Sequence, residues 1–314
     1  MKRTLITTVT LNAAIDKTYF VPAFEHGIVS RVEKALSTAG GKGLNVARVL
    51  RQLGQADVAA TGFAGGYNGK FITSKVEEAG IAAAFVECAG ESRICLNVID
   101  GRDGSSTELL EPGPEIGEAE MAALKRKLAR LSAESAVVVF SGSLPKGVPL
   151  GAYAELIALS REAGAEVFLD TSGEALALGT AALPSFVKPN EDEIAALLPK
   201  GKDGDLRDGI ASLMERGLSQ VVVTLGGEGA VAGIRGRLYR VRIPPVRAVS
   251  AVGSGDAFVA GYAYGQARGW PAEDVLKFAA AAGSANAMSP LTGDVDAALH
   301  RGLLSEITVE EWRT

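Results

Sequence analysis

Short apolar, β-branched segments alternate with longer amphipathic stretches through the second half of the chain. Four of these segments are predicted to be strands, at residues 136–140, 166–169, 186–188 and 221–225. Strands separated by helices are typical of a parallel sheet with crossover helices. The pattern therefore predicts an α/β fold with a doubly wound, mostly parallel sheet and helices on both faces.

Polar and glycine residues follow each of these four strands. The segments are Ser141-Gly142-Ser143, Asp170-Thr171-Ser172, Lys188-Pro189-Asn190 and Thr224-Leu225-Gly226-Gly227. In open α/β sheets, ligands bind outside the carboxyl ends of the strands. The sequence thus predicts a binding cleft along this edge of the sheet.

Two parts of the N-terminal half break the alternation of strands and helices. Residues 17–24 and 31–37 look like strands, and residues 93–99 lead through an Asp-Gly turn into 105–110, which predicts a hairpin. We expect these pieces to form a small β-sheet lid (17–37 and 87–112) over a core made of 1–16, 38–86 and 113–314. Because such a sheet has an apolar face to cover, we expect a homodimer formed through the lid.

Composition narrows the class of protein. The 314 residues are 47% hydrophobic and 22% charged, which is typical of a globular domain. A net charge of −5 gives no indication of a nucleic-acid or acidic-membrane partner. The first residues read as a strand rather than a signal peptide, so a cytoplasmic location is expected. Cys88 and Cys95 are too few for a disulfide framework, and His26 and His300 lack metal-ligand spacing.

A glycine-rich segment at 250–258 precedes a helical pattern that runs through Gly265. Gly253, Ser254 and Gly255 would let backbone amides face a single point at the start of that helix, where phosphate oxygens bind well. Asp256 would lie at the same opening and could take a proton from an attacking hydroxyl. The alternative is that Asp256 only favours the start of the helix.

A second glycine loop lies near the N-terminus, again before a helical stretch. Gly40 and Gly41 allow close approach of a ligand, Lys42 supplies a positive charge, and Asn45 supplies both a donor and an acceptor. These features predict a site for a polar small molecule. The alternative is a glycine turn that happens to precede a helix.

Asn12 and Asp16 follow the first predicted strand. Their spacing of four places both on the same cleft if the connection turns tightly. Asp16 could otherwise be an ordinary surface turn residue.

Two other phosphate-binding motifs are excluded. The string G-x-x-x-x-G-K-[ST] of P-loop proteins does not occur. Gly227, Gly229 and Ala232 match a dinucleotide fingerprint, but the residues after them predict a hairpin rather than the required helix. A nicotinamide-dependent oxidoreductase is therefore disfavoured.

Six motifs taken together resemble one family along essentially the whole chain. They are Thr10-Leu11-Asn12-Ala13-Ala14-Ile15-Asp16, Gly40-Gly41-Lys42-Gly43-Leu44-Asn45-Val46-Ala47, Glu111-Pro112-Gly113-Pro114, Ser141-Gly142-Ser143-Leu144-Pro145, Lys188-Pro189-Asn190-Glu191-Asp192-Glu193 and Gly253-Ser254-Gly255-Asp256. The chain resembles the ribokinase-like carbohydrate kinases, specifically the PfkB branch that contains 1-phosphofructokinase and tagatose-6-phosphate kinase. The resemblance implies a ribokinase-like fold, with ATP and Mg²⁺ as cofactors.

The resemblance also implies roles for residues on the catalytic and nucleotide side. Asp256 corresponds to the catalytic base, and Gly253, Ser254 and Gly255 to the anion hole. Asn190 and Glu193 match the pair that organises Mg²⁺ and its waters. The positions that match ATP contacts are Lys188, Asn190, Thr224, Gly226, Gly229 and Asn286.

On the sugar side, the resemblance implies that Asp16 and Asn45 bind hydroxyls, with backbone contacts at Gly40 and Gly41. The substrate's own phosphate would be held by Lys42, Arg93, Ser141 and Arg31.

Three positions depart from the family pattern. Ser254 replaces the commoner Ala, and Ala13 replaces a Pro. Phe140 stands where the 6-phosphofructokinase relatives carry an Arg that holds the sugar phosphate, which weakens fructose 6-phosphate as the substrate.

The leading hypothesis is an ATP-dependent kinase that converts fructose 1-phosphate to fructose 1,6-bisphosphate. Tagatose-6-phosphate kinase, 6-phosphofructokinase and a neutral sugar kinase of the same fold stay open. Arg93 and Lys42 would lack an anion if they faced a neutral sugar, which argues against the neutral sugar kinase. A catalytically silent sugar-phosphate sensor is the alternative from a different class, and it would not need a base and a metal-organising pair.

Overall fold

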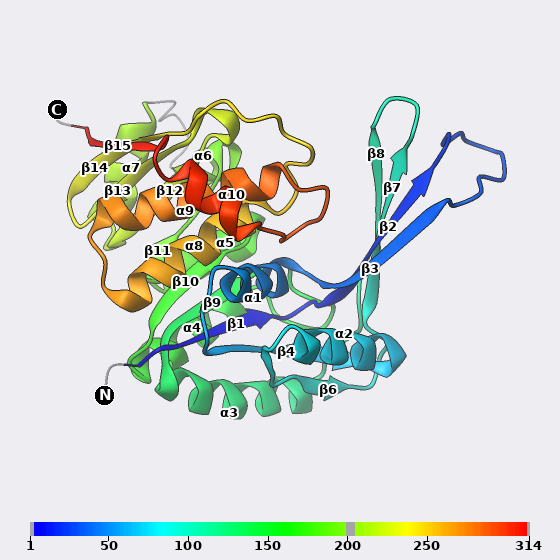
Figure 1. Cartoon of the computed structure of the whole chain (residues 1–314). Coiled ribbons are helices and arrows are strands. Elements are labelled where there is room, and N and C mark those ends of the chain that lie inside the picture. Colours follow the sequence, from blue (N-terminus) through cyan, green and yellow to red (C-terminus); the bar gives the residue numbers. More distant parts are fainter. Residues whose placement is uncertain (1–2, 199–204, 313–314) are drawn as a thin grey trace.

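The computed structural model describes residues 3–198 and 205–312. Within these residues, an eleven-stranded sheet forms the body of the molecule (Figure 1). Its strands are β1 (Leu5–Thr10), β4 (Val58–Gly65), β5 (Ala82–Ala83), β6 (Val86–Cys88), β9 (Ser135–Ser141), β10 (Glu166–Asp170), β11 (Phe186–Val187), β12 (Gln220–Thr224), β13 (Ala230–Ile234), β14 (Arg237–Arg242) and β15 (Thr308–Glu311).

Most of this sheet is parallel. The strand order is β15-β14-β13-β12-β11-β10-β9-β1-β4-β5, with β6 beside β4. Pairing is parallel from β12 across to β5 and β6, and antiparallel from β12 to β15. The predicted doubly wound, mostly parallel sheet is confirmed.

Helices cover both faces of the sheet. One face packs against α1 (Lys42–Gln52), α2 (Gly66–Glu78), α8 (Ser254–Arg268), α9 (Ala272–Ala287) and α10 (Ala297–Leu303). The other packs against α3 (Glu118–Glu134), α4 (Ala152–Glu162), α5 (Gly173–Ala181), α6 (Glu191–Leu197) and α7 (Leu206–Glu215). Two separate apolar cores result, one on each side of the sheet.

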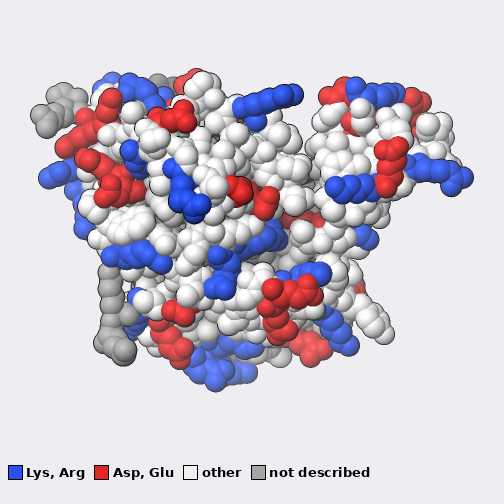
Figure 2. All heavy atoms as spheres, viewed as in Figure 1, with Lys and Arg blue, Asp and Glu red and all other residues white. Residues whose placement is uncertain are grey.

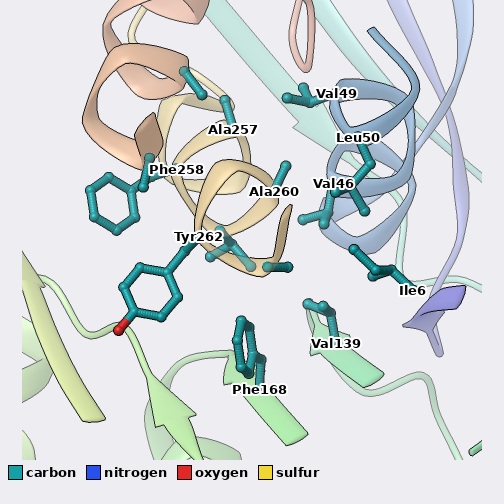
Figure 3. Close-up of a cluster of buried hydrophobic side chains, with 14 of the residues drawn as sticks. Ile6, Val46, Val49, Leu50, Val139, Phe168, Ala257, Phe258, Ala260 and Tyr262 are labelled. Atoms are coloured by element: carbon teal, nitrogen blue, oxygen red, sulfur yellow. The ribbon is translucent and has the colours of Figure 1, made fainter. Parts of the chain in front are cut away.

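The core around α8 fixes the position of the two glycine loops. In Figure 3, Ala257 and Ala260 of α8 and Val46 of α1 lie over the sheet residues Ile6 and Val139. These side chains are fully buried, and small residues let α8 approach its neighbours closely. Because α1 and α8 pack together, the glycine loops that precede them are held side by side.

A second sheet stands apart from the body (Figure 1). Its strand order is β3 (Lys34–Gly40), β2 (Ala14–Val21), β7 (Arg93–Asp100) and β8 (Ser106–Leu110). Strand β2 is antiparallel to β3 and parallel to β7, whereas β7 and β8 form the predicted hairpin. We call this sheet the lid.

The structure also bears on the rejected dinucleotide fingerprint. The glycines at 226–229 form a short 3₁₀ turn, η1 (Gly226–Glu228), followed by the antiparallel strands β13 and β14. A two-residue turn joins these strands, with φ of 49° at Arg235 and 84° at Gly236. The predicted hairpin is therefore confirmed, and no helix follows the glycines to receive a pyrophosphate.

Lys and Arg side chains are interspersed with Asp and Glu side chains over the face seen in Figure 2, on both body and lid. Among the described residues, no helix combines the length and the apolar character that crossing a membrane would require.

Candidate active site

A cleft of about 310 Å³ lies where the lid meets the helix starts at the ligand-binding edge of the sheet. Strands β2, β7 and β8 form one wall, and the first residues of α1 and α8 form the other. It brings together many of the residues singled out in the sequence: Asp16, Gly41, Lys42, Asn45, Arg93, Gly253, Gly255 and Asp256.

The start of α8 forms the floor of the cleft. Gly253 precedes the helix with φ of 82°, a left-handed conformation that favours glycine. A Cβ atom there would lie 2.7 Å from Cγ2 of Thr292 and 2.9 Å from the amide nitrogen of Gly293, so no larger residue fits. The first amides of a helix lack intrahelical partners, and Gly253 and Gly255 line the cleft, so this helix start is the predicted anion site.

Asp256 lies in the first turn of α8 and is only 5% exposed. Its Oδ2 accepts a hydrogen bond of 2.9 Å from Nδ2 of Asn45, which joins the two glycine-loop helices. Burial raises the pKa of Asp256 to about 6, although the Lys42 ammonium group works in the opposite direction. Asp256 is therefore largely ionised at neutral pH and still basic enough to accept a proton.

Two lysines share one buried carboxylate beside Asp256. Nζ of Lys42 lies 3.5 Å from Oδ2 of Asp170, and Nζ of Lys188 lies 3.4 Å from Oδ1. Burial alone would raise the pKa of Asp170, but the two ammonium groups outweigh it and lower that pKa. Asp170 in turn raises the pKa of Lys42. With Asp256 counted, two carboxylates balance these two ammonium groups, and each ammonium group is a donor suited to phosphate oxygens.

The sequence assigned no role to Asp170. The available signal was its position: it ends a buried strand, β10, at the ligand-binding edge of the sheet.

Asp16 projects from β2 into the cleft, beside the first glycine loop. A Cβ atom at Gly40 would overlap the carboxyl group of Asp16, so glycine is required there to make room for that carboxyl. Burial raises the pKa of Asp16 to about 6, opposed by Arg48, Arg93 and the backbone amide of Gly41.

The predicted phosphate-binding residues are only partly brought together. Arg93 lines the cleft, and its guanidinium donates to the carbonyl oxygens of Asn12 at 3.2 Å and Glu111 at 3.4 Å. Ser141 ends β9 with its hydroxyl completely buried, so it does not form part of the cleft wall. Arg31 is exposed in the connection between β2 and β3, outside the cleft of its own chain.

Asn12 lies behind the cleft wall. It is 5% exposed, and its Nδ2 donates to the carbonyl oxygen of Pro112 at 3.2 Å and to Oγ of Ser143 at 3.3 Å. It thereby joins three of the sequence motifs to one another.

The predicted nucleotide residues lie on neighbouring strand ends. Lys188 follows β11, and its Nζ would be 3.2 Å from a Cβ atom at Gly255, so it lies against the anion site. The backbone of Asn190 forms an isolated parallel β-bridge with Thr224, at the end of β12. Gly226 and Gly229 have φ of 54° and 91° in the turn that follows.

Asn190 and Glu193 form a reciprocal cap at the start of α6. Oδ1 of Asn190 accepts from the amide of Glu193 at 2.8 Å, and the amide of Asn190 donates to Oε2 of Glu193 at 2.9 Å. No group of three or more His, Cys, Asp or Glu side chains among the described residues could hold a metal. This donor set fits Mg²⁺ held mainly by phosphate oxygens and water, with one carboxylate nearby.

Asn286 is completely buried in α9. Its Nδ2 donates to the carbonyl oxygen of Val252 at 2.9 Å and to Oγ of Ser254 at 3.3 Å, and its Oδ1 accepts from the amide of Asp294 at 3.2 Å. The side chain thus supports the anion loop from behind. A contact with adenine stays a prediction.

Residues 9–297 match the family described as pfkB family carbohydrate kinase. A tagatose-6-phosphate kinase from Staphylococcus epidermidis is 38% identical over 98% of this chain and 100% of its own length. Phosphofructokinase-2 from Escherichia coli, solved in complex with fructose-6-phosphate, is 29% identical with a TM-score of 0.88, covering 96% of this chain and 98% of its own. A protein from Thermotoga maritima, described as a possible 1-phosphofructokinase, is 27% identical with a TM-score of 0.86, covering 98% and 100%.

A ribokinase from T. maritima, 19% identical with a TM-score of 0.77 over 96% of this chain and 99% of its own, has the same fold. The predicted ribokinase-like fold is thus confirmed. With the family match spanning nearly the whole chain, this protein belongs to the pfkB family of carbohydrate kinases.

Proposed function

We propose that this kinase transfers the γ-phosphoryl group of ATP to a hydroxyl of a ketohexose phosphate, with fructose 1-phosphate as the leading substrate and fructose 1,6-bisphosphate as its product. One observation carries the proposal: the buried carboxylate of Asp256 lies at the open end of α8, bonded to Asn45 of the other glycine loop. A hydroxyl held by that loop would stand beside both a base and an anion site.

The charges around the cleft suggest how the residues divide the reaction. Asp256 would accept the proton of the attacking hydroxyl, and the amides of Gly253 to Gly255 would stabilise the transferring phosphoryl group. Lys42 and Lys188, held by Asp170, would face the phosphate oxygens. Bound Mg²⁺ would neutralise phosphate charge, with Asn190 and Glu193 orienting its waters.

The surroundings of Arg93 favour a substrate that already carries a phosphate. Its guanidinium is held by two backbone carbonyl oxygens, and no carboxylate forms an ion pair with it among the described residues. Opposite a neutral sugar, Arg93 would be compensated mainly by Asp16, whose charge it shares with Arg48. The planar guanidinium suits bidentate binding of a phosphate.

Tagatose 6-phosphate is the second candidate, because the S. epidermidis relative of that name matches along the whole chain. Fructose 6-phosphate has less support. Phe140, at the position where the 6-phosphofructokinase relatives carry an Arg, is completely buried with its ring 5.9 Å from that of Tyr153.

A coupled assay of ADP release tests the proposal across fructose 1-phosphate, fructose 6-phosphate, tagatose 6-phosphate, fructose and tagatose. We expect kcat/KM to be highest for one of the ketohexose phosphates. Equal turnover of free sugars would identify a neutral sugar kinase instead. Binding of the phosphosugars without turnover of any of them would favour the sensor.

A further inference from the structure

Arg48 has a role that neither the motifs nor the family match assigns. It lies on α1, one turn after Asn45. Its Nη1 donates to the carbonyl oxygen of Thr292 at 2.8 Å, to that of Gly293 at 3.4 Å and to Oδ1 of Asn45 at 3.3 Å. Its Nη2 donates to the carbonyl oxygen of Ala39, directly before the glycine loop. One guanidinium therefore joins three separate segments of the chain.

The turn at 292–293 lies directly beneath the anion site. A Cβ atom at Gly253 would lie 2.7 Å from Cγ2 of Thr292, and a Cβ atom at Gly293 would lie 2.8 Å from Cβ of Asn45. The turn thus packs between the start of α8 and the first glycine loop with the start of α1 (residues 40–45), which we call the sugar loop. Arg48 donates to both carbonyl oxygens of this turn. A substitution of Arg48 would therefore disturb the residues on both sides of the cleft.

Burial lowers the pKa of Arg48, and the three carboxylates that it faces, those of Asp16, Asp294 and Asp256, offset only part of that effect. Asp16 in turn faces Arg48, Arg93 and the amide of Gly41, with Glu108 as an opposing negative charge. Arg93 lies on the lid, where a substrate phosphate would neutralise it. Arg48 is not among the residues that line the cleft and would remain as the positive charge that compensates Asp16.

We propose that Arg48 is a positioning residue, which fixes the sugar loop against the turn beneath the anion site and supplies the charge that keeps Asp16 a carboxylate when a phosphosugar is bound. The inference rests on the proposed function, because it assigns Asp16 to the sugar hydroxyls. A carboxylate accepts two strong hydrogen bonds from such hydroxyls, whereas the protonated acid accepts weaker ones.

The test compares Arg48→Gln and Arg48→Lys with the wild type and with Arg51→Gln. Arg51 is a matched control on the same helix, because it also donates to backbone carbonyl oxygens, those of Gln55, Ala56 and Ala79, but away from the cleft. We expect Arg48→Gln to raise KM for the phosphosugar by roughly ten-fold. The acidic limb of its kcat/KM profile should also move up by about one pH unit.

Arg48→Lys separates the two parts of the role. It keeps the charge, so the acidic limb should stay near that of the wild type. It cannot reach all the carbonyl oxygens, so KM should stay raised. Arg51→Gln should lower thermal stability with unchanged KM and unchanged acidic limb. If Arg48→Gln proves too unstable to assay, a wild-type KM in Arg48→Lys would overturn the bridging role.

A measurement that needs no substrate tests the role of Arg48 separately from the proposed function. Carbon-13 NMR titration of the Asp16 carboxyl, assigned with Asp16→Asn, should show a higher pKa in Arg48→Gln than in the wild type. An unchanged Asp16 titration together with a wild-type KM would overturn the inference. Absence of phosphosugar turnover in the wild type would instead defeat the proposed function, while the titration would still decide the part played by Arg48.

Discussion

Asp16 and Asp256 face one cleft, and burial brings both carboxyl groups to a pKa of about 6. Their neighbours differ. Asp256 accepts a hydrogen bond from the amide of Asn45 and faces the ammonium groups of Lys42 and Lys188, whereas Asp16 faces the guanidinium groups of Arg48 and Arg93. A proton acceptor needs a pKa close to the working pH, whereas a hydrogen-bond acceptor for sugar hydroxyls only needs to be ionised. The two pKa values are alike and do not separate the roles. The proposed division rests on position, because Asp256 lies at the start of α8 and Asp16 lies beside the first glycine loop.

Asp256→Asn should lower kcat by at least the roughly 10²–10⁴-fold that is typical when a general base is lost. The amide keeps the shape of the side chain, so KM for ATP should hardly change. Steady-state kinetics at saturating substrate measure both quantities. Near-normal turnover of the variant would rule Asp256 out as the base.

The pH profile of kcat/KM should fall on the acidic side through about pH 6, because a protonated Asp256 cannot accept the proton of the hydroxyl. The sign follows from the charged form being the active one: activity is present above the pKa and lost below it. Asp16 titrates in the same range, so the limb should be steeper than one proton. Asp16→Asn should reduce that slope to one proton; a flat profile from pH 5 to 8 would contradict both assignments.

Arg93→Ala should raise KM for the phosphosugar by roughly ten-fold to a hundred-fold with little change in KM for ATP, since a charge-assisted hydrogen bond contributes roughly 1.5–3 kcal/mol. The measurement is a pair of KM titrations, one in each substrate. If the substitution raised KM for ATP alone, Arg93 would belong to the nucleotide site.

At the scale of elements, the cleft depends on two helix starts that are held by small residues. Gly261 of α8 faces α9 so closely that a Cβ atom there would lie 2.8 Å from Cα of Ala279. Helix α1 packs on α8 from the other side (Figure 3). The predicted anion site therefore begins a helix that packs closely against both of its neighbours.

Gly253→Ala should reduce kcat strongly, because the left-handed backbone and the nearby Thr292 both oppose a Cβ atom. Gly236→Ala is the matched control: it has φ of 84° in the turn between β13 and β14, with nothing within 4 Å of the added atom. Both should lower the thermal midpoint, but only Gly253→Ala should lower kcat. An equal kcat in the two variants would mean that the start of α8 accepts a Cβ atom at Gly253 without loss of activity.

At the scale of the whole molecule, the lid leaves one of its faces uncovered. Tyr19, Ile94, Leu96 and Leu109 surround a hollow of about 400 Å³ on the lid, and Leu109 is 57% exposed. Lys17 and Glu111 stand at the same hollow, whereas the cleft has more polar lining residues, Asp16 and Asn97 among them. An apolar sheet face of this kind is usually covered.

We expect a homodimer that joins the two lids, detectable by light scattering at micromolar concentration. Leu109→Lys should shift it toward monomer by placing a charge in the contact, with reduced activity because the lid would lose support. Tyr67→Lys, at an apolar residue that is 83% exposed on α2, is the control and should leave the mass unchanged. A fully active monomeric wild type would remove the prediction.

The order of strands and helices, the hairpin 93–110 and both glycine loops could be predicted from the sequence. These features depend on local patterns: alternation of apolar residues, glycine where backbone must turn, and an Asp-Gly turn between strands. Lys42, Asn45 and Asp256 lie on the cleft wall because they stand at or near the starts of helices whose place at the sheet edge was predictable, whereas Asp16 lies within strand β2 of the lid.

Only the tertiary structure decided how these groups act on one another. Asp170 joins Lys42 to Lys188 across more than a hundred residues of sequence, and Arg48 reaches a turn at 292–293. Ser141 is completely buried, whereas the next two residues of its motif, Gly142 and Ser143, are not. Burial and charge act through distances in space, and no pattern along the chain encodes those distances, so the raised pKa of Asp256 and the support beneath the anion site became visible only once the helices were packed.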